Sequence, residues 1–167
     1  MRDSPPTDPP IVLLDFDAWA NDQLFDACQP LSNEDLDRSF EMGLGTLRKT
    51  MTHMLGAMRG WTDVLIEADP PRPRLEHDPD RSVDDLRKLH ETISPAFRLA
   101  CFDGSHGDVL TPDRNGKTHK FSRGGIMMHV MTHSMHHRAQ CLNMLRHLGR
   151  EQPQSSVMHW MMAHPPQ

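Results

Sequence analysis

The feature that most constrains the fold of this chain is a long apolar stripe with helical spacing. Between residues 46 and 67, apolar side chains recur at every third or fourth position, as Leu47, Met51, Met54, Leu55, Met58, Trp61 and Leu65. This spacing places them on one face of an α-helix. Such a face must be buried against other elements, so the segment predicts a long helix within a packed bundle.

Three further segments have the features of long helices. The first spans about residues 11–31, with apolar side chains at helical spacing and Pro30 at its end. The second opens at Ser82, because an acid three residues later (Asp85) completes an N-cap pattern, and it extends to about Cys101. Pro95 inside this segment is expected to kink or divide the helix.

The third of these segments begins near Gly124 or Gly125 and stops at Gly149, a residue type that favours the end of a helix. A short helical tail, SSVMHWMMA, is expected to follow. Between the helices, residues 69–81 (DPPRPRLEHDPDR) contain too much proline for regular structure and predict a crossover loop. In DVLTPDRNGKTHKFS, the pair Asn115-Gly116 predicts the tight turn of a short β-hairpin.

Together these elements predict an all-α fold. The expected architecture is a four-helix bundle with a long crossover and a short β-hairpin before the last long helix. Residues 1–10 are rich in proline and form a flexible lead-in, so residues 11–167 are expected to make up one helical-bundle domain.

Composition narrows the classes of function. The net charge of −5, from 18 basic and 23 acidic residues, argues against a nucleic-acid-binding protein, which usually has a basic face. We find no secretory signal and no apolar run long enough to span a bilayer, so we expect no membrane association. The three cysteines, Cys28, Cys101 and Cys141, are odd in number and widely spaced, which fits the reducing cytoplasm better than a disulfide framework.

The stretch HVMTHSMHHRAQ, residues 129–140, places four histidines in the last long helix. With a rotation of 100° per residue and His129 at zero, His133 lies at about 40° and His137 at about 80°, at the edge of the apolar sector. His129 and His136 lie on the polar flank, together with Gln140. Met127, Met128, Met131 and Met135 lie at about 160° to 260°, and are interpreted as core residues that point away from the histidine face.

Histidines four residues apart, such as His133 and His137, lie one turn apart and can bind the same metal ion. From the spacing alone, four partly exposed histidines without a metal remain an open alternative. A third ligand would have to come from another helix, and His53 lies at the edge of the apolar stripe among small residues that leave space for an imidazole. A hydrogen-bonded, half-buried histidine is the alternative for His53. Arg138 is expected to pair with another helix or with solvent, and Asn21 to contact the rim of the pocket.

Several other sites are excluded by missing motifs. A ferritin-like di-iron site needs glutamates with a histidine three residues later, and none of the glutamates has one. The HExxH motif of zinc proteases and the G-x-S-x-G motif of serine hydrolases are also absent.

Three segments resemble the DinB / YfiT-like family of small helical-bundle proteins. They are WAND at 19–22, TLRKTMTHMLGAMRGW at 46–61, and HVMTHSMHHRAQ at 129–140 with the Leu-Arg-x-x-Gly ending at 145–149. The resemblance implies a four-helix bundle, often a homodimer, in which three histidines hold a divalent metal. By position, these ligands fall on His53, His133 and His137. Ala139 and Ser155-Ser156 depart from the family pattern, where a glycine and an acid are usual.

Characterised members of this family include thiol-dependent S-transferases and an isomerase that uses a low-molecular-weight thiol. The resemblance therefore implies a metal-dependent enzyme of the transferase, isomerase or hydrolase type, acting on a small molecule. The alternative is a non-catalytic metal-binding protein with a role in stress response or interaction. Three histidines with an open coordination position are typical of catalytic metal sites, and we expect zinc or nickel as the ion. His136, His129 and Gln140 are candidates to assist the ligands, and the catalytic residues themselves stay unassigned.

Overall fold

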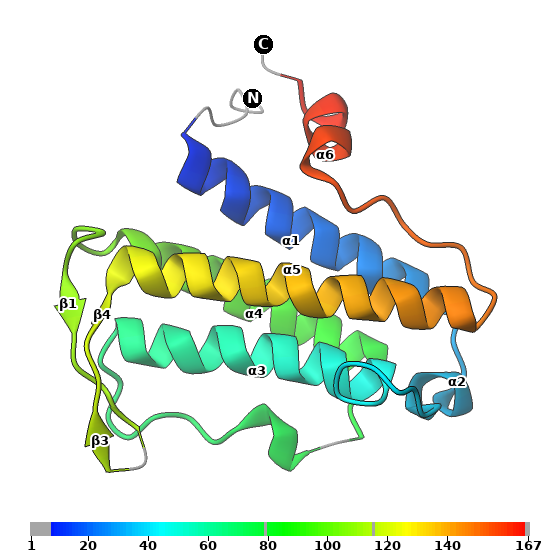
Figure 1. The fold of residues 1–167 in the computed structure, drawn as a ribbon, viewed down its shortest axis with the longest axis horizontal. Helices are drawn as coiled ribbons and strands as arrows, with labels where there is room; N and C mark the ends of the chain where they lie inside the picture. The colour runs from blue at the N-terminus through cyan, green and yellow to red at the C-terminus, as the bar shows by residue number, and fades with distance from the viewer. Residues whose placement is uncertain (1–7, 79, 115, 166–167) are drawn as a thin grey trace.

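The computed structural model describes residues 8–78, 80–114 and 116–165 and is built from four long helices. They are α1 (Pro9–Cys28), α3 (Leu47–Leu65), α4 (Val83–Phe102) and α5 (Arg123–His147). In Figure 1, α5 and α3 run side by side at the front, with α1 above and α4 behind. The predicted all-α fold with four long helices is confirmed. Within the described residues, we find no helix with both the length and the apolar character needed to cross a membrane.

The apolar stripe of α3 forms the centre of the core. Leu47, Met51, Leu55 and Leu65 are at most 2% exposed, and they pack against α4 and α5. On α5, Ile126 and Met144 are equally buried. Helices α3 and α5 therefore share one apolar interface. Side chains of α3 and α5 that lie along the same border of this interface face each other.

The ends of the helices follow local sequence signals. The hydroxyl of Ser82 accepts a hydrogen bond from the backbone N–H of Asp85, and the Asp85 carboxylate accepts one from the Ser82 backbone, which completes the predicted capping box of α4. Gly149 follows α5 with φ of +70°, a conformation that glycine adopts without steric cost. Pro95 lies inside α4 and does not divide it.

The connection between α4 and α5 contains two short antiparallel pairs, β1 (Val109–Leu110) with β4 (Phe121–Ser122) and β2 (Asp113–Arg114) with β3 (Lys117–Thr118). The predicted hairpin is thus present, while Asn115 in its turn lies outside the described residues. The Phe121 ring meets the Trp61 ring edge to face at 5.4 Å, which fixes the hairpin against the C-terminal half of α3.

Three short helices complete the chain. The sequence reasoning did not predict α2 (Asn33–Asp37), a single turn capped by the hydroxyl of Ser32. The predicted tail helix is observed as α6 (Val157–Ala163), whose Trp160 packs against Phe16 and Ala20 of α1. A 3₁₀ turn, η1 (Leu75–His77), lies within the predicted crossover loop and is anchored by the buried Leu75. Of the flexible lead-in predicted for residues 1–10, residues 1–7 lie outside the described part of the chain. Pro9 and Pro10 were wrongly included, because they form the first turn of α1, where proline is tolerated.

A buried ion pair joins α5 to α1. The guanidinium of Arg138 donates to the carboxylate of Asp17 at 2.7 Å and to the amide oxygen of Asn21 at 2.8 Å, and all three side chains are buried. Arg138 therefore pairs with another helix, as expected. Asn21 belongs to this buried network, so its predicted place at the pocket rim is wrong. Because Arg138 directly follows His137, the ion pair fixes the rotation of α5 about its axis at the histidine cluster.

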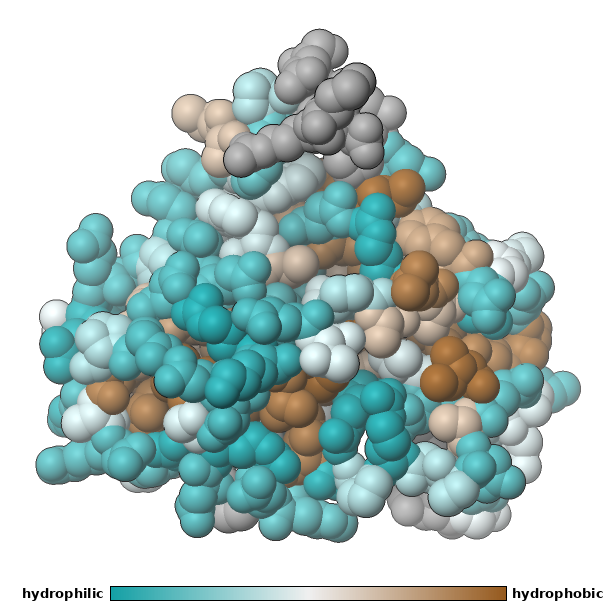
Figure 2. Space-filling model, turned by 180° about the vertical axis from the view of Figure 1, so that it is seen from behind, coloured by the Kyte–Doolittle hydropathy of each residue, from teal (hydrophilic) through white to brown (hydrophobic). Residues whose placement is uncertain are grey.

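The surface is mostly polar but carries apolar patches. Figure 2 shows one face as largely hydrophilic with brown patches between teal side chains. On α5, Met128 and Met135 are 49% and 51% exposed, so their predicted place in the core is wrong. Met127 and Met131 are buried, as predicted.

Candidate metal centre

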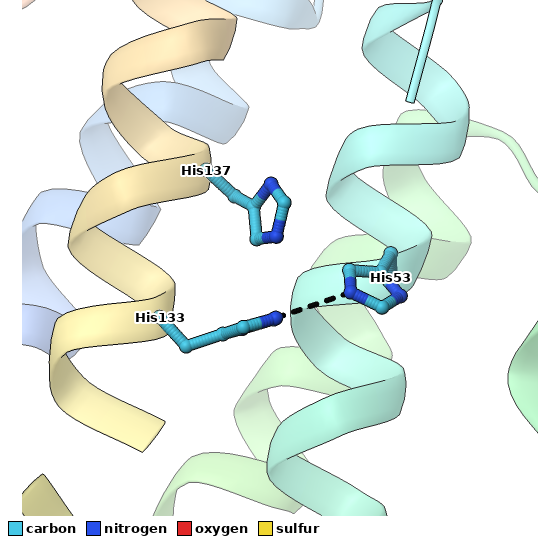
Figure 3. A group of neighbouring side chains, drawn as sticks. All are labelled: His53, His133 and His137. Atoms are coloured by element: carbon cyan, nitrogen blue, oxygen red, sulfur yellow. Dashed lines mark hydrogen bonds between the residues drawn. The ribbon is translucent and has the colours of Figure 1, made fainter. Parts of the chain in front are cut away.

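The inward pair of histidines on α5 faces the single histidine of α3. His133 and His137 are one turn apart on α5 and point toward His53, which comes from the facing turn of α3 (Figure 3). The side chains meet because both helices bury their apolar sectors in the same interface, and each histidine lies at the edge of its sector. His137 is buried, whereas His53 and His133 are partly exposed.

The distances suit three ligands of one ion. One nitrogen from each ring lies within 4.8 Å of those from the other two. The Nε2 atoms of His53 and His133 are 3.1 Å apart, and their ring centroids are 4.9 Å apart. Zinc binds imidazole nitrogen at about 2.1 Å, so tetrahedral ligands lie about 3.4 Å from one another. The ligand atoms are thus close to metal-binding separations, and small side-chain rotations suffice for the rest.

Two of the three imidazoles have an oxygen acceptor on the nitrogen that faces away from the cluster. The Nδ1–H of His137 donates to Oε1 of Gln140 at 2.7 Å, and that of His53 donates to Oε1 of Glu76 at 3.3 Å. Metal-binding histidines usually have such a partner, because a hydrogen bond at one nitrogen holds the other unprotonated for the metal. The donor set and its partners therefore fit a divalent ion.

The two outward histidines take different positions. His136 is exposed and accepts a hydrogen bond from the Gln140 amide at 3.0 Å, and its ring also meets the His137 ring edge to face at 5.0 Å. His129 is also exposed, and its ring meets the Trp61 ring edge to face at 5.3 Å. Of the three residues suggested to assist the ligands, only Gln140 contacts one directly by a hydrogen bond.

Burial and mutual repulsion lower the pKa values of His133 and His137. Desolvation first, and then the neighbouring histidines with His137 ahead of the others, lower the pKa of His133 to about 4. Desolvation also lowers the pKa of His137, although the hydrogen bond to Gln140 opposes this. Neutral imidazole is the form that binds metals, so the lowered pKa values of His133 and His137 favour metal binding by these two rings near neutral pH.

A cleft of about 590 Å³ opens beside the histidines. His53 and His133 line it, and α3 also contributes Gly56 and Trp61 to the wall. The crossover loop adds Arg72, Arg74 and Glu76, and the hairpin adds Asp113. The wall is therefore partly polar and partly apolar, as in many small-molecule sites.

Sequence reasoning missed the contribution of the crossover loop. Glu76 in this loop contacts the candidate ligand His53, and it follows Leu75, the buried apolar anchor of the loop. An acid next to a lone apolar residue in a proline-rich loop was the available signal. The pattern shows that the loop is anchored, but it does not show which helix lies beneath it.

The fold and the histidine cluster define a helical-bundle protein with a candidate metal centre between two helices. A comparison with protein families matches residues 4–166 to the DinB family, so the chain belongs to this family. Among solved structures, the chain is similar to a DinB-like protein from Bacillus cereus, with a TM-score of 0.61 and 18% identity over 85% of this chain and 92% of that chain. This likeness concerns the fold. A search of curated proteins found no match.

Proposed function

We propose that this protein is a metal-dependent enzyme that uses His53, His133 and His137 to hold one divalent ion, zinc or nickel. The observation that carries the proposal is that the three imidazoles lie together and that two of them, His53 and His133, line an open, partly polar cleft. A non-catalytic metal-binding protein would need no such cleft, and this favours the enzyme over that alternative. Three protein ligands also leave a coordination position free for water or substrate.

The proposed reaction class is thiol transfer, isomerisation or hydrolysis of a small molecule. When bound, the ion would act as a Lewis acid that lowers the pKa of a water or thiol at the open position. The chain's own residues would orient the substrate. Trp61 offers an apolar surface in the cleft, Arg74 a cation for an acidic group, and His129 an exposed imidazole on the wall that can accept a proton. Membership of the DinB family supports a low-molecular-weight thiol as the co-substrate.

Elemental analysis of protein purified without a histidine tag tests the metal site. We expect about one equivalent of zinc or nickel per chain, with most of it lost in His53→Ala, because two remaining imidazoles form an incomplete site. His147→Ala is the control, since it removes an exposed histidine from the same helix as His133. Equal metal content in the wild type and His53→Ala would contradict the three-histidine site.

Turnover assays test the enzyme. Metal-loaded protein is incubated with a panel of low-molecular-weight thiols and an electrophile, and separately with esters, and the products are measured by mass spectrometry. We expect turnover that His133→Ala abolishes. If the protein retains its metal but converts none of these substrates, the non-catalytic alternative is favoured.

We also propose a homodimer and a cytoplasmic location. The half-exposed Met128 and Met135 support an interface between copies, because they lie seven positions apart on one face of α5 and contiguous apolar patches mark interaction sites. Light scattering coupled to size exclusion tests this, and Met128→Lys should favour the monomer. The free, buried thiols of all three cysteines support a reducing compartment.

A further inference from the structure

Glu76 lies against a candidate metal ligand on the side away from the metal position. Its Oε1 is 3.3 Å from Nδ1 of His53, whereas Nε2 of the same ring faces His133 at 3.1 Å. The carboxylate is 42% exposed and the imidazole 32% exposed, so the pair lies at the mouth of the site. Glu76 thus contacts the imidazole at the nitrogen that an ion bound at Nε2 would leave free.

The crossover loop is held rigidly at this point. Leu75, next to Glu76, is 2% exposed in the core, and its carbonyl accepts a hydrogen bond from the guanidinium of Arg81. Two residues before Leu75, the carbonyl of Pro73 accepts from Arg59 of α3. The guanidinium of Arg72 donates to the Asp63 carboxylate of α3 at 2.7 Å. Arg81 also donates to the carbonyl of Asp78 at 2.6 Å, so three arginines fix the loop on both sides of Glu76, and its approach to α3 is built into the fold.

A glycine on α3 makes space for the Glu76 carboxylate. A Cβ atom added at Gly56 would lie 2.9 Å from Oε1 of Glu76, closer than side chains pack. A glycine also lies beside Gln140, the hydrogen-bond partner of His137, because a Cβ atom at Gly43 would lie 2.7 Å from Oε1 of Gln140. Each oxygen that accepts from a ligand Nδ1–H therefore rests against a glycine.

We propose that Glu76 is a positioning residue for the metal centre, and that Gly56 is required for its approach. The carboxylate accepts the Nδ1–H of His53, holds the ring in the tautomer whose Nε2 is unprotonated, and directs that nitrogen to the ion. A charged acceptor also makes the imidazole a stronger ligand. The proposal rests on the proposed function, because it requires His53 to be a metal ligand.

The first test measures the affinity of the full chain for Zn²⁺ by competition with a chromophoric chelator. Loss of a hydrogen-bond partner of a ligand histidine commonly weakens metal binding about 10-fold to 100-fold, and we expect this in Glu76→Ala. Glu76→Gln should recover part of the loss, because its amide oxygen still accepts the Nδ1–H. Gly56→Ala should weaken binding in the same direction, since its methyl group displaces the carboxylate.

Gly60→Ala is the matched control, since Gly60 lies on the same helix as Gly56 and a Cβ atom there would meet nothing within 4 Å. It should leave the Zn²⁺ affinity unchanged. Combining Gly56→Ala with Glu76→Ala should cost no more than Glu76→Ala alone, because the methyl group acts through the carboxylate. Urea unfolding of each variant shows whether the fold is retained.

The second test reads the tautomer without metal. In ¹⁵N NMR spectra of the metal-free protein, His53 should show a protonated Nδ1 in the wild type and Glu76→Gln, and a shift toward protonated Nε2 in Glu76→Ala. Unchanged Zn²⁺ affinity and an unchanged His53 tautomer in Glu76→Ala would overturn the positioning role. If the wild type and His53→Ala bind Zn²⁺ equally, the proposed function itself fails, which is a different result.

Discussion

The buried guanidinium of Arg138 gives the strongest stability prediction. Replacing it with methionine, which has a similar length, removes the partner of the Asp17 carboxylate in a place without access to solvent. Breaking one side of a buried ion pair costs about 3–5 kcal/mol, because the remaining charge is uncompensated. We therefore expect Arg138→Met to lower the free energy of unfolding by about this amount, a large part of the 5–15 kcal/mol usual for a domain.

The assay is urea unfolding followed by circular dichroism, with metal removed from all samples. Arg150→Met is the control, because Arg150 pairs with Asp35 at 3.2 Å while 49% of its side chain is exposed. Exposed pairs contribute less than about 1 kcal/mol. A second variant, Asp17→Asn with Arg138→Met, replaces the stranded charge with an isosteric amide. This double variant should be more stable than Arg138→Met by about 2 kcal/mol.

Two results would refute this reasoning. Arg138→Met could cost no more than Arg150→Met, in which case burial does not set the strength of the pair. Alternatively, the double variant could be less stable than Arg138→Met, which would show that the stranded carboxylate is not the source of the loss.

Three other measurements test the structure. Metal-free protein should lose stability as the pH falls from about 6.5 toward 4, because an unfolded chain protonates His133 near pH 6.5 whereas the folded chain holds the His133 pKa at about 4. The difference between the urea midpoints at pH 7.5 and pH 5 should be smaller in His133→Asn than in the wild type. An equal difference in the two proteins would contradict the assignment. Ser82→Ala should cost about 1 kcal/mol through loss of the capping box on α4, measured by thermal unfolding, and no change would show that the cap is dispensable. Burial raises the pKa of Cys28 and of Cys101 to about 12, and it raises the pKa of Cys141 well above its usual range. A disulfide reagent at pH 8 should therefore label the three thiols only after unfolding. Fast labelling of the native protein would contradict their burial.

The bundle and the inward pair of histidines could be predicted because helix geometry is local. A rotation of 100° per residue separates His133 and His137 from His129 and His136 without knowledge of any neighbour. The structure brings the inward pair together with His53, as the sequence suggested. Whether the three residues bind a metal stays a prediction.

The errors of the sequence analysis concern what lies against each helix face. Angles alone indicated a core position for Met128 and Met135, but the width of a buried sector depends on which helix covers it. The rim position expected for Asn21 was wrong because this side chain is buried with Arg138. The carboxylate of Glu76 reaches His53 across 23 residues of chain that include most of the crossover loop. Such a contact is set by tertiary closure and by the arginines that fasten the loop, and no periodicity in the sequence encodes it.

The separation of the histidines along the chain has a consequence for biosynthesis. His53 and His133 meet although they are 80 positions apart in the chain, and His137 follows four positions later. At a synthesis rate of about 5 to 20 residues per second, roughly 4 to 16 s pass between the first imidazole and the second. A nascent chain that ends before α5 thus offers one of the three imidazoles. Insertion of an ion at this position is therefore a late event, which follows the docking of the last long helix.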